Sequence, residues 1–570
     1  MNAKPIQRRH NVNLDAVTLN IMMSAFHAAA EEMGVNLLLT ARSTIIREAR
    51  DCSCALLDPE GRIIAEAEHI PVQMSSISLP MRACLARHGG RIAPGEVFVT
   101  NDPFLGGQHL QDITIFSPIF HEDRLLGYAA SIAHHVDIGG GSAGLTLGAR
   151  EFYEEGLRFS ALKMRRDEDF RPGGVFYELV HSNFRAPRTT WGDIQAQLAA
   201  NAVGERRILE LARRNGADTL LAAMTAAMDY SEKLMRASIS EIPDGRYEAE
   251  DFIDDSIAST EPIPIRVALE VAGDEIHVDL SGSAPQIEEF LNVPFGSTCS
   301  SSFSAIKMAL TAGRATIPAN DGCYRPIRIT APEGSILNPL PPAATRARMC
   351  GAYRVFDAIL MALHQAIPDR ASGLGFHVNT TIGFTRRQGA EYSIFIEDIG
   401  GGWGGTPAGD GADMLDAPLS NCRITPTEAV ELDHPFLRVK RYELLSDTGG
   451  AGCHRGGLGS VREFEVLGDG VSFFGYADRH RQAPKGAAGG YPGSCGAFIL
   501  RRGETETRLA SKSAIELERG DRLVVVVGGG GGYGAPEERS RAAISADVTT
   551  GKLSAARAGS DYPQMEGVPA

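Results

Sequence analysis

Residues 100–140 have the sequence TNDPFLGGQHLQDITIFSPIFHEDRLLGYAASIAHHVDIGG, which combines two apolar, strand-like runs with four histidines and several carboxylates. The runs 113–120 and 124–134 are separated by residues 121–123, a polar link short enough for a β-hairpin. Antiparallel pairing returns the end of the second strand to the start of the first. The sequence therefore predicts His109 and Asp112 beside His134 and His135, which follow them by more than 20 positions.

Imidazoles and carboxylates gathered in this way are typical ligands of a divalent metal such as Zn, Mn or Fe. Successive side chains of a strand point to opposite faces, so only one of His134 and His135 is expected to reach an ion, and the sequence leaves the choice open. His121 is expected in the solvated turn of the hairpin. The alternative interpretation is that these residues are caps and buried, hydrogen-bonded histidines.

A second polar cluster follows at residues 151–163, EFYEEGLRFSALK. Glu154 or Glu155 is a candidate to complete a coordination sphere or to act as a general base. Glutamates in such a run also commonly form a solvated face. Both interpretations stay open from the sequence.

Composition indicates a globular protein of several domains, because 570 residues exceed what one hydrophobic core usually organises. The formal charge of -15 argues against nucleic acid or an anionic membrane as the main partner. No apolar run approaches the ~18 residues of a membrane span, and residues 1–15 have no apolar signal region, so a cytoplasmic protein is expected. The nine cysteines form no CxxC pair and are expected to be buried, reduced thiols.

The patterns along the chain predict a multi-domain α+β fold. Asp15 is expected to cap a helix that ends near Gly34, and Asp193 to cap the first of two long helices within residues 191–242. Short strands dominate afterwards. The expected domains are 1–242, an α/β domain with the metal site and two long helices; 243–435, a β-rich middle domain; and 436–570, a strand-rich C-terminal domain.

Two glycine runs, at residues 400–405 and 528–532, are not followed by Gly-Lys-Ser or Gly-Lys-Thr. They also do not open a dinucleotide-binding unit. Tight turns are therefore expected at both places. The chain has no convincing nucleotide-binding motif of its own.

Six motifs in order resemble the hydantoinase B family, which includes subunits of N-methylhydantoinases, 5-oxoprolinases, caprolactamase, and acetone and acetophenone carboxylases. The resemblance extends from about residue 15 to about residue 562. The motifs are TNDPFLGGQHLQD (100–112), AHHVDIGG (133–140), GDIQAQLAAN (192–201), IPANDGCYRPI (317–327), VKRYELLSDTGGAGCHRGGLGSVREF (439–464) and GGGGYGAPEER (529–539).

The resemblance implies a catalytic subunit that works in a hetero-oligomer with a hydantoinase A type partner, which carries ATP and Mg. The partner phosphorylates an amide or enol oxygen of a small-molecule substrate, and the metal site of this chain then acts on the activated species. The family motifs HxxD and HH imply His109, Asp112 and His134 or His135 as ligands. Asp102 in the NDP motif is a further candidate ligand or proton acceptor, and Asp137 and Glu155 are candidate proton acceptors.

The leading hypothesis is an ATP-dependent cyclic amidohydrolase subunit of the hydantoinase or 5-oxoprolinase type. A subunit of an ATP-dependent ketone carboxylase is the first alternative, because the motifs do not separate the two branches. The second alternative is a noncatalytic scaffold that stabilises the A-type subunit.

Overall fold

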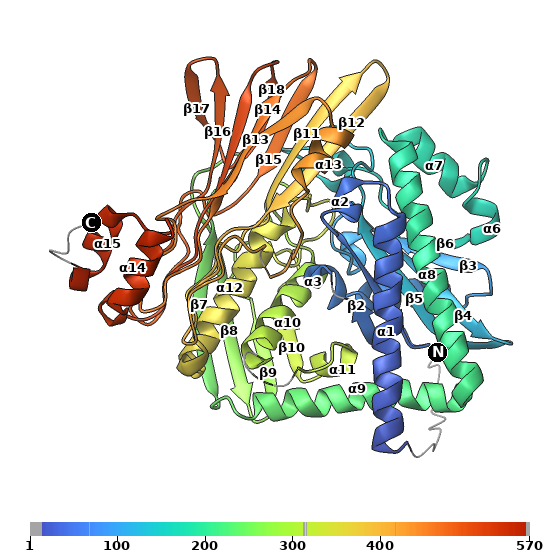
Figure 1. The fold of residues 1–570 in the computed structure, drawn as a ribbon. Coiled ribbons are helices and arrows are strands. Elements are labelled where there is room, and N and C mark those ends of the chain that lie inside the picture. The colour runs from blue at the N-terminus through green and yellow to red at the C-terminus, as the bar shows by residue number, and fades with distance from the viewer. Residues whose placement is uncertain (1–13, 68, 312–313, 315, 417, 566–570) are drawn as a thin grey trace.

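The computed structural model describes residues 14–67, 69–311, 314, 316–416 and 418–565, and the N-terminal residues 1–13 lie outside this part. The described chain folds into four β-sheets with helices between and around them (Figure 1). This arrangement confirms the predicted multi-domain α+β class. Within the described residues, no helix has both the length and the apolar character needed to cross a bilayer.

The first sheet has six antiparallel strands in the order β2-β1-β5-β4-β3-β6. Its strands are β1 (Cys52–Leu57), β2 (Ile63–Ala67), β3 (Glu96–Thr100), β4 (Asp112–His121), β5 (Arg124–His134) and β6 (Leu162–Arg165).

The predicted hairpin is formed by β4 and β5, with Asp112 opposite His134 and His121 opposite Arg124. Because His121 still pairs, the link has two residues instead of three. Glu122 in this link has a φ of 56°, a left-handed conformation that suits a tight hairpin turn. The register places the beginning of β4 directly beside the end of β5.

Three long helices, α1, α8 and α9, pack beside this sheet (Figure 1). Together with the shorter helices of this part they are α1 (Ala16–Thr40), α2 (Thr44–Arg47), α3 (Pro71–Met74), α4 (Ser78–His88), η1 (Pro103–Leu105), α5 (Phe152–Glu155), α6 (Arg166–Asp169), α7 (Val175–Asn183), α8 (Pro187–Asn215) and α9 (Ala217–Ile239).

Two predicted helix boundaries are wrong for a packing reason. Asp15 does cap α1, accepting a hydrogen bond of 2.8 Å from the Thr18 amide, but the helix continues past Gly34 to Thr40. A Cβ at Gly34 would lie 2.6 Å from Cε1 of His69, so glycine permits close packing there and does not end the helix. Asp193 lies inside α8, where its carboxylate accepts the amides of Arg42 (2.6 Å) and Ser43 (3.1 Å) instead of capping its own helix.

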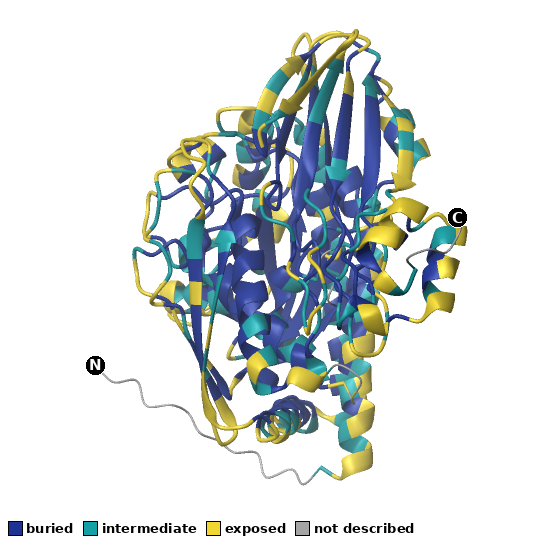
Figure 2. Ribbon diagram, turned by 90° about the vertical axis from the view of Figure 1, so that its left-hand side faces the viewer, coloured by how far each residue is buried: buried dark blue, intermediate teal, exposed yellow. Residues whose placement is uncertain are grey.

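The second sheet has four strands in the order β10-β9-β8-β7, and helix α12 packs against β7 and β8. Apolar side chains of this part and of the first sheet's helices belong to one buried cluster, which lies in the interior of the molecule (Figure 2). The elements are β7 (Gly245–Ile253), β8 (Ile263–Ala272), β9 (Glu275–Asp279), α10 (Phe295–Thr311), α11 (Asp321–Tyr324), β10 (Ile327–Thr330), α12 (Arg348–Ala366) and η2 (Pro368–Arg370).

The last two sheets, with orders β12-β11-β15-β18 and β13-β14-β19-β16-β17, share a second apolar cluster. They stand together at the top of Figure 1. The elements are β11 (Thr380–Gln388), β12 (Glu391–Ile399), α13 (Thr427–Asp433), β13 (Leu437–Leu444), β14 (Ser460–Val466), β15 (Val471–Tyr476), β16 (Ala497–Arg502), β17 (Thr505–Leu509), β18 (Lys512–Leu517), β19 (Arg522–Val527), η3 (Pro536–Glu538), α14 (Arg541–Thr549), α15 (Ala555–Asp561) and η4 (Pro563–Met565).

The domain limits at residues 242 and 435 stay predictions. The first falls between α9 and β7. The second separates β11 and β12 from β15 and β18, although these four strands form one sheet. Residues on both sides of position 435 therefore share hydrogen bonds and a core.

The glycine runs do not form the expected tight turns. None of the glycines at 400–405 or 528–532 has a positive φ. The segments instead run past each other and bond backbone to backbone, as from the Gly402 amide to the Gly528 carbonyl (3.0 Å) and from Gly530 to Gly457 (3.0 Å). A Cβ at Gly457 would lie 1.8 Å from the Ala412 carbonyl oxygen. Glycine is needed because these backbones approach too closely for any side chain.

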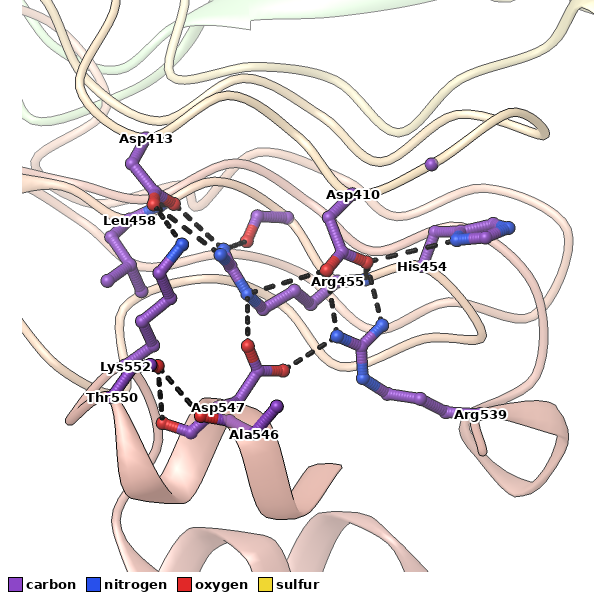
Figure 3. Close-up of polar contacts among 12 residues, drawn as sticks. Asp410, Asp413, His454, Arg455, Leu458, Arg539, Ala546, Asp547, Thr550 and Lys552 are labelled. Carbon is purple, nitrogen blue, oxygen red and sulfur yellow. Dashed lines mark hydrogen bonds and ion pairs between the residues drawn. The ribbon is translucent and has the colours of Figure 1, made fainter. Parts of the chain in front are cut away.

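A partly buried network of charged side chains ties helix α14 to these loops (Figure 3). Arg539 forms a two-pronged ion pair with Asp410 (2.7 and 2.8 Å) and contacts Asp547 of α14 at 2.6 Å. Arg455 contacts Asp547 at 3.3 Å and Asp413 at 2.8 Å. Lys552 completes what we call the arginine network through a 2.8 Å contact with Asp413.

Candidate metal centre

The loop that carries His109 is held rigidly between β3 and β4. Asn101 donates to the carbonyl oxygens of Leu110 (2.6 Å) and Leu157 (2.9 Å). Gln108 accepts a hydrogen bond of 2.6 Å from Ser297 and donates one of 3.0 Å to Ser76. These contacts join the loop to helix α10 and to the segment between α3 and α4, and they fix where the His109 ring lies.

The structure brings together three of the four predicted ligands. His109 Nε2 lies 3.2 Å from Asp112 Oδ2 and 3.2 Å from His134 Nδ1. His134 Nδ1 lies 3.5 Å from Asp112 Oδ1. All three side chains are buried, and their donor atoms form a compact group suited to a metal ion.

The spacing of these atoms fits a small divalent ion. Ligand bonds of ~2.1 Å in a tetrahedral site place neighbouring ligand atoms ~3.4 Å apart. The closest separations between the three side chains are 3.2 to 3.5 Å, with Oδ2 of Asp112 nearest His109 and Oδ1 nearest His134. Two imidazoles and one carboxylate match the donor set expected for Zn, Mn or Fe.

His135 points to the opposite side of β5, as the alternation of side chains requires. Its Nε2 lies 3.1 Å from Oε1 of Gln197 in α8. Burial lowers the pKa of His135 to about 4, so its ring is neutral. The register of the hairpin thus directs His134, and not His135, toward His109 and Asp112.

Asp51 is a fourth residue of the cluster, and it was missed from the sequence. Its Oδ2 lies 3.4 Å from His134 Nδ1, and its Oδ1 accepts a 2.8 Å hydrogen bond from Gln73. Asp51 immediately precedes β1, which pairs with β5 so that Cys52 lies opposite Ala133. A prediction of that strand pairing would have identified it.

A second buried group, Asp51, Asp398 and Cys422, adjoins the first through Asp51. Asp398 lies near the end of β12, and Cys422 follows in the next loop. Members of both groups, His109, His134, Asp51, Asp398 and Cys422, line a cavity of about 20 Å³, roughly the room for one water molecule. Arg348, at the beginning of α12, also lines this cavity.

Burial and local charge set the ionisation of the cluster. Burial and the Arg348 guanidinium lower the pKa of His109 well below its usual range, so the imidazole is neutral. Burial acts to raise the pKa of Asp112, but the Arg348 guanidinium, 3.0 Å from Oδ2, helps to hold this pKa well below normal. Burial and the charges of Asp112 and Asp398 raise the pKa of Asp51 well above normal. A divalent cation would favour the ionised form of all these carboxylates.

A hydrogen bond orients His109 for metal binding. Its Nδ1 lies 3.3 Å from the Arg346 carbonyl oxygen, which can only accept, so Nδ1 carries the proton and Nε2 is free to bind an ion. The Arg346 amide in turn donates to Glu155 (2.7 Å). Arg348 supports Asp112 from another side with a 3.0 Å contact to its Oδ2.

Glu155 lies one step behind the cluster and does not line the cavity. Its Oε1 accepts the amides of Thr345 (2.9 Å) and Arg346 (2.7 Å). Burial raises the pKa of Glu155 to about 7. The neighbouring Glu154 is exposed, as the alternative interpretation of this segment expects.

Asp102 and Asp137 are buried in loops near the cluster, but neither lines the cavity. Asp102 caps the short helix η1 by accepting the Phe104 amide (3.0 Å). Asp137 accepts hydrogen bonds from the amides of Gly139 (3.1 Å) and Arg185 (2.7 Å). These contacts fix the loops on either side of the hairpin.

Comparison with known proteins identifies the family to which the chain belongs. Residues 15–536 match the family described as hydantoinase B/oxoprolinase. A putative B-type subunit of a D-/L-hydantoinase from Pseudomonas sp. (strain NS671) is 34% identical, with 96% of this chain and 95% of the relative covered. The beta chain of caprolactamase from Pseudomonas jessenii is 31% identical, with 95% and 94% covered.

Solved structures have the same fold. The crystal structure of ATP-dependent caprolactamase from Pseudomonas jessenii superposes with a TM-score of 0.88 at 30% identity, covering 97% of this chain and 96% of that one. Nucleotide-free acetone carboxylase gives a TM-score of 0.84 at 18% identity, covering 96% and 79%. The chain belongs to the hydantoinase B/oxoprolinase family.

Proposed function

We propose that this protein is the metal-dependent catalytic subunit of an ATP-dependent cyclic amidohydrolase of the hydantoinase or 5-oxoprolinase type. The observation that carries the proposal is the buried group His109, Asp112 and His134, whose donor atoms lie close enough together to bind one divalent ion. The relatives named for hydantoin and caprolactam chemistry support a cyclic amide as the substrate class.

Two relatives are named as single subunits of a larger enzyme, which supports a hetero-oligomer with an A-type partner. ATP and Mg are assigned to that partner, because neighbouring backbone packs directly against the glycine runs of this chain and leaves no room there for a nucleotide. Since the reaction consumes ATP, we assign the pair to the cytoplasm. The partner would activate the substrate by phosphorylating the amide oxygen, which turns a poor electrophile into one that water can attack.

The residues of this chain prepare the site for that attack. A divalent ion bound by His109, Asp112 and His134 would polarise the substrate and lower the pKa of a water molecule toward ~7. Arg348 keeps Asp112 ionised, and the Arg346 carbonyl keeps the His109 lone pair on Nε2. Asp51 lies close enough to His134 to serve as a fourth ligand.

We assign positioning roles to the three carboxylates that the sequence suggested as catalytic groups. Glu155 holds the backbone at Arg346, whose carbonyl orients His109. Asp102 and Asp137 fix the loops before and after the hairpin. A direct catalytic role for Asp102, Asp137 or Glu155 stays a prediction.

The test is ATP-dependent ring opening of hydantoins and 5-oxoproline by the purified chain together with its A-type partner, with elemental analysis of the same preparation. We expect a stoichiometric divalent metal and turnover that needs both proteins and ATP. Bicarbonate-dependent consumption of a ketone, without ring opening, would instead establish the carboxylase alternative. Full turnover by metal-free protein would show that the chain is a scaffold.

A further inference from the structure

A larger cavity of about 510 Å³ opens beside the candidate metal centre. It shares Asp398 and Cys422 with the small cavity that His109 and His134 line. Its volume lies within the ~300–1,000 Å³ that small-molecule sites usually have. A substrate in this pocket would therefore reach the metal cavity past Asp398 and Cys422.

Three arginines line this pocket, and they differ in their partners. Arg47 is neutralised by Glu48 (2.8 Å) and Asp433 (2.6 Å). Among the described residues, no carboxylate forms an ion pair with Arg50 or Arg423. Two guanidinium groups of like charge thus line one pocket, and neither is held in a direct ion pair within the described part of the chain.

The backbone holds these two arginines in place. Arg50 has a φ of 65°, a left-handed conformation that is unfavourable for a residue with a side chain. The Arg423 amide donates to the carbonyl oxygen of Ala49 (2.9 Å), so the two arginines come from segments joined by a hydrogen bond. The backbone at Arg50 therefore has an unfavourable conformation at a position where its side chain lines the pocket.

The carboxylates in the same pocket have other partners. Asp398 accepts a 2.6 Å hydrogen bond from Thr381, and Asp416 accepts one of 2.9 Å from Ser420. The remaining wall is largely apolar, with Leu415, Ile424 and the ring of Tyr442. The pocket therefore combines an apolar surface for a ring with two cationic groups for an anion.

We propose that Arg50 and Arg423 form an oxyanion subsite of the substrate pocket, which binds a phosphoryl or carboxylate group of the reacting molecule beside the metal centre. This assignment rests on the proposed function for the identity of the reacting molecule. Guanidinium groups suit both anions, because their planar N–H donors match two oxygens at once. The anion is either the phosphoryl group added during activation or a carboxylate of the substrate itself.

The first experiment needs no turnover. Binding of inorganic phosphate and of acetate to the purified chain is measured by calorimetry for the native protein, Arg50→Gln, Arg423→Gln and the control Arg328→Gln, an exposed arginine on β10. We expect each pocket variant to bind the anion about tenfold more weakly, and the control to be unchanged. Arg423 is exposed, so its replacement tests the subsite even if Arg50→Gln does not fold. Equal binding by all four proteins would overturn the subsite.

The second experiment identifies the source of the anion, using the chain with its A-type partner. If the subsite binds a substrate carboxylate, Arg423→Gln raises KM for 5-oxoproline but not for a neutral lactam. If it binds the phosphoryl group, the variant lowers ring opening relative to ATP consumption with both substrates. Weaker anion binding without ring opening by any native preparation would refute the proposed function and leave the subsite standing. Ring opening that the variants do not change in either way would refute the subsite alone.

Discussion

Two polar clusters of this molecule, one partly and one fully buried, differ in how their charges are balanced. In the arginine network, the carboxylates of Asp410, Asp413 and Asp547 meet Arg455, Arg539 and Lys552 at 2.6 to 3.3 Å (Figure 3). Around His109, the carboxylates of Asp51, Asp112 and Asp398 meet neutral imidazoles and the guanidinium of Arg348.

The difference separates a structural cluster from a candidate functional one. Opposite charges in the arginine network neutralise each other, and the result ties α14 to the glycine-rich loops. Around His109, burial and then repulsion from Asp112 and Asp398 raise the pKa of Asp51 well above normal. Either protons or a divalent cation must compensate such a cluster, and the donor spacing favours the cation.

The largest effect is expected from removing a ligand. His109→Ala or Asp112→Ala should abolish stoichiometric metal binding and reduce ATP-dependent ring opening by more than the ~10–100-fold typical of changes to residues that only support a ligand. His135→Ala is the matched control, because that ring faces Gln197 and should not affect the metal. Elemental analysis measures the metal content of the folded variants, and a turnover assay measures their ring opening. A folded His109→Ala protein with its full metal content would contradict the assignment.

A smaller effect, on the free energy of unfolding alone, is expected in the arginine network. Arg539→Ala leaves Asp410 and Asp547 without their main partner and should lower the free energy of unfolding by about 3 kcal/mol. The metal content should not change. Urea denaturation measures the effect against Arg541→Ala, an exposed neighbour. Loss of metal without loss of stability would mean that the two clusters have been assigned the wrong way round.

The smallest expected effect concerns the pH dependence of stability at Glu155. Because burial raises its folded-state pKa to about 7 from the ordinary 4.5, this carboxyl stabilises the fold fully below pH 4.5, and its contribution is lost as the pH rises through 7. Glu155→Gln should remove this slope, which amounts to at most about 1.4 kcal/mol per pH unit. Denaturation curves from pH 4.5 to 8 measure it, with the exposed Glu154→Gln as control. An unchanged slope in Glu155→Gln would show that Glu155 is not the titrating group.

Much of the local structure was predictable from short-range patterns. The alternating apolar runs and the polar link of residues 113–134 specified the hairpin to within a residue, because turn chemistry and strand periodicity are properties of neighbouring residues. The same local rules failed at Gly34 and Asp193. Gly34 is needed because the His69 ring packs against it, and Asp193 accepts a hydrogen bond from the Arg42 amide. Neither contact can be predicted from the residues next to them in the sequence.

The sequence by itself determined the α+β class, the hairpin, the family and the candidate ligands His109 and Asp112. Only the tertiary structure decided between His134 and His135, since alternation requires one of them to face the cluster and only the strand register says which. It also added Asp51, Arg348, Asp398 and Cys422, which come from a strand, a helix and two separate loops. The periodicity of apolar residues can be recognised within a short segment of sequence. A buried site is instead assembled when segments that are hundreds of positions apart pack together.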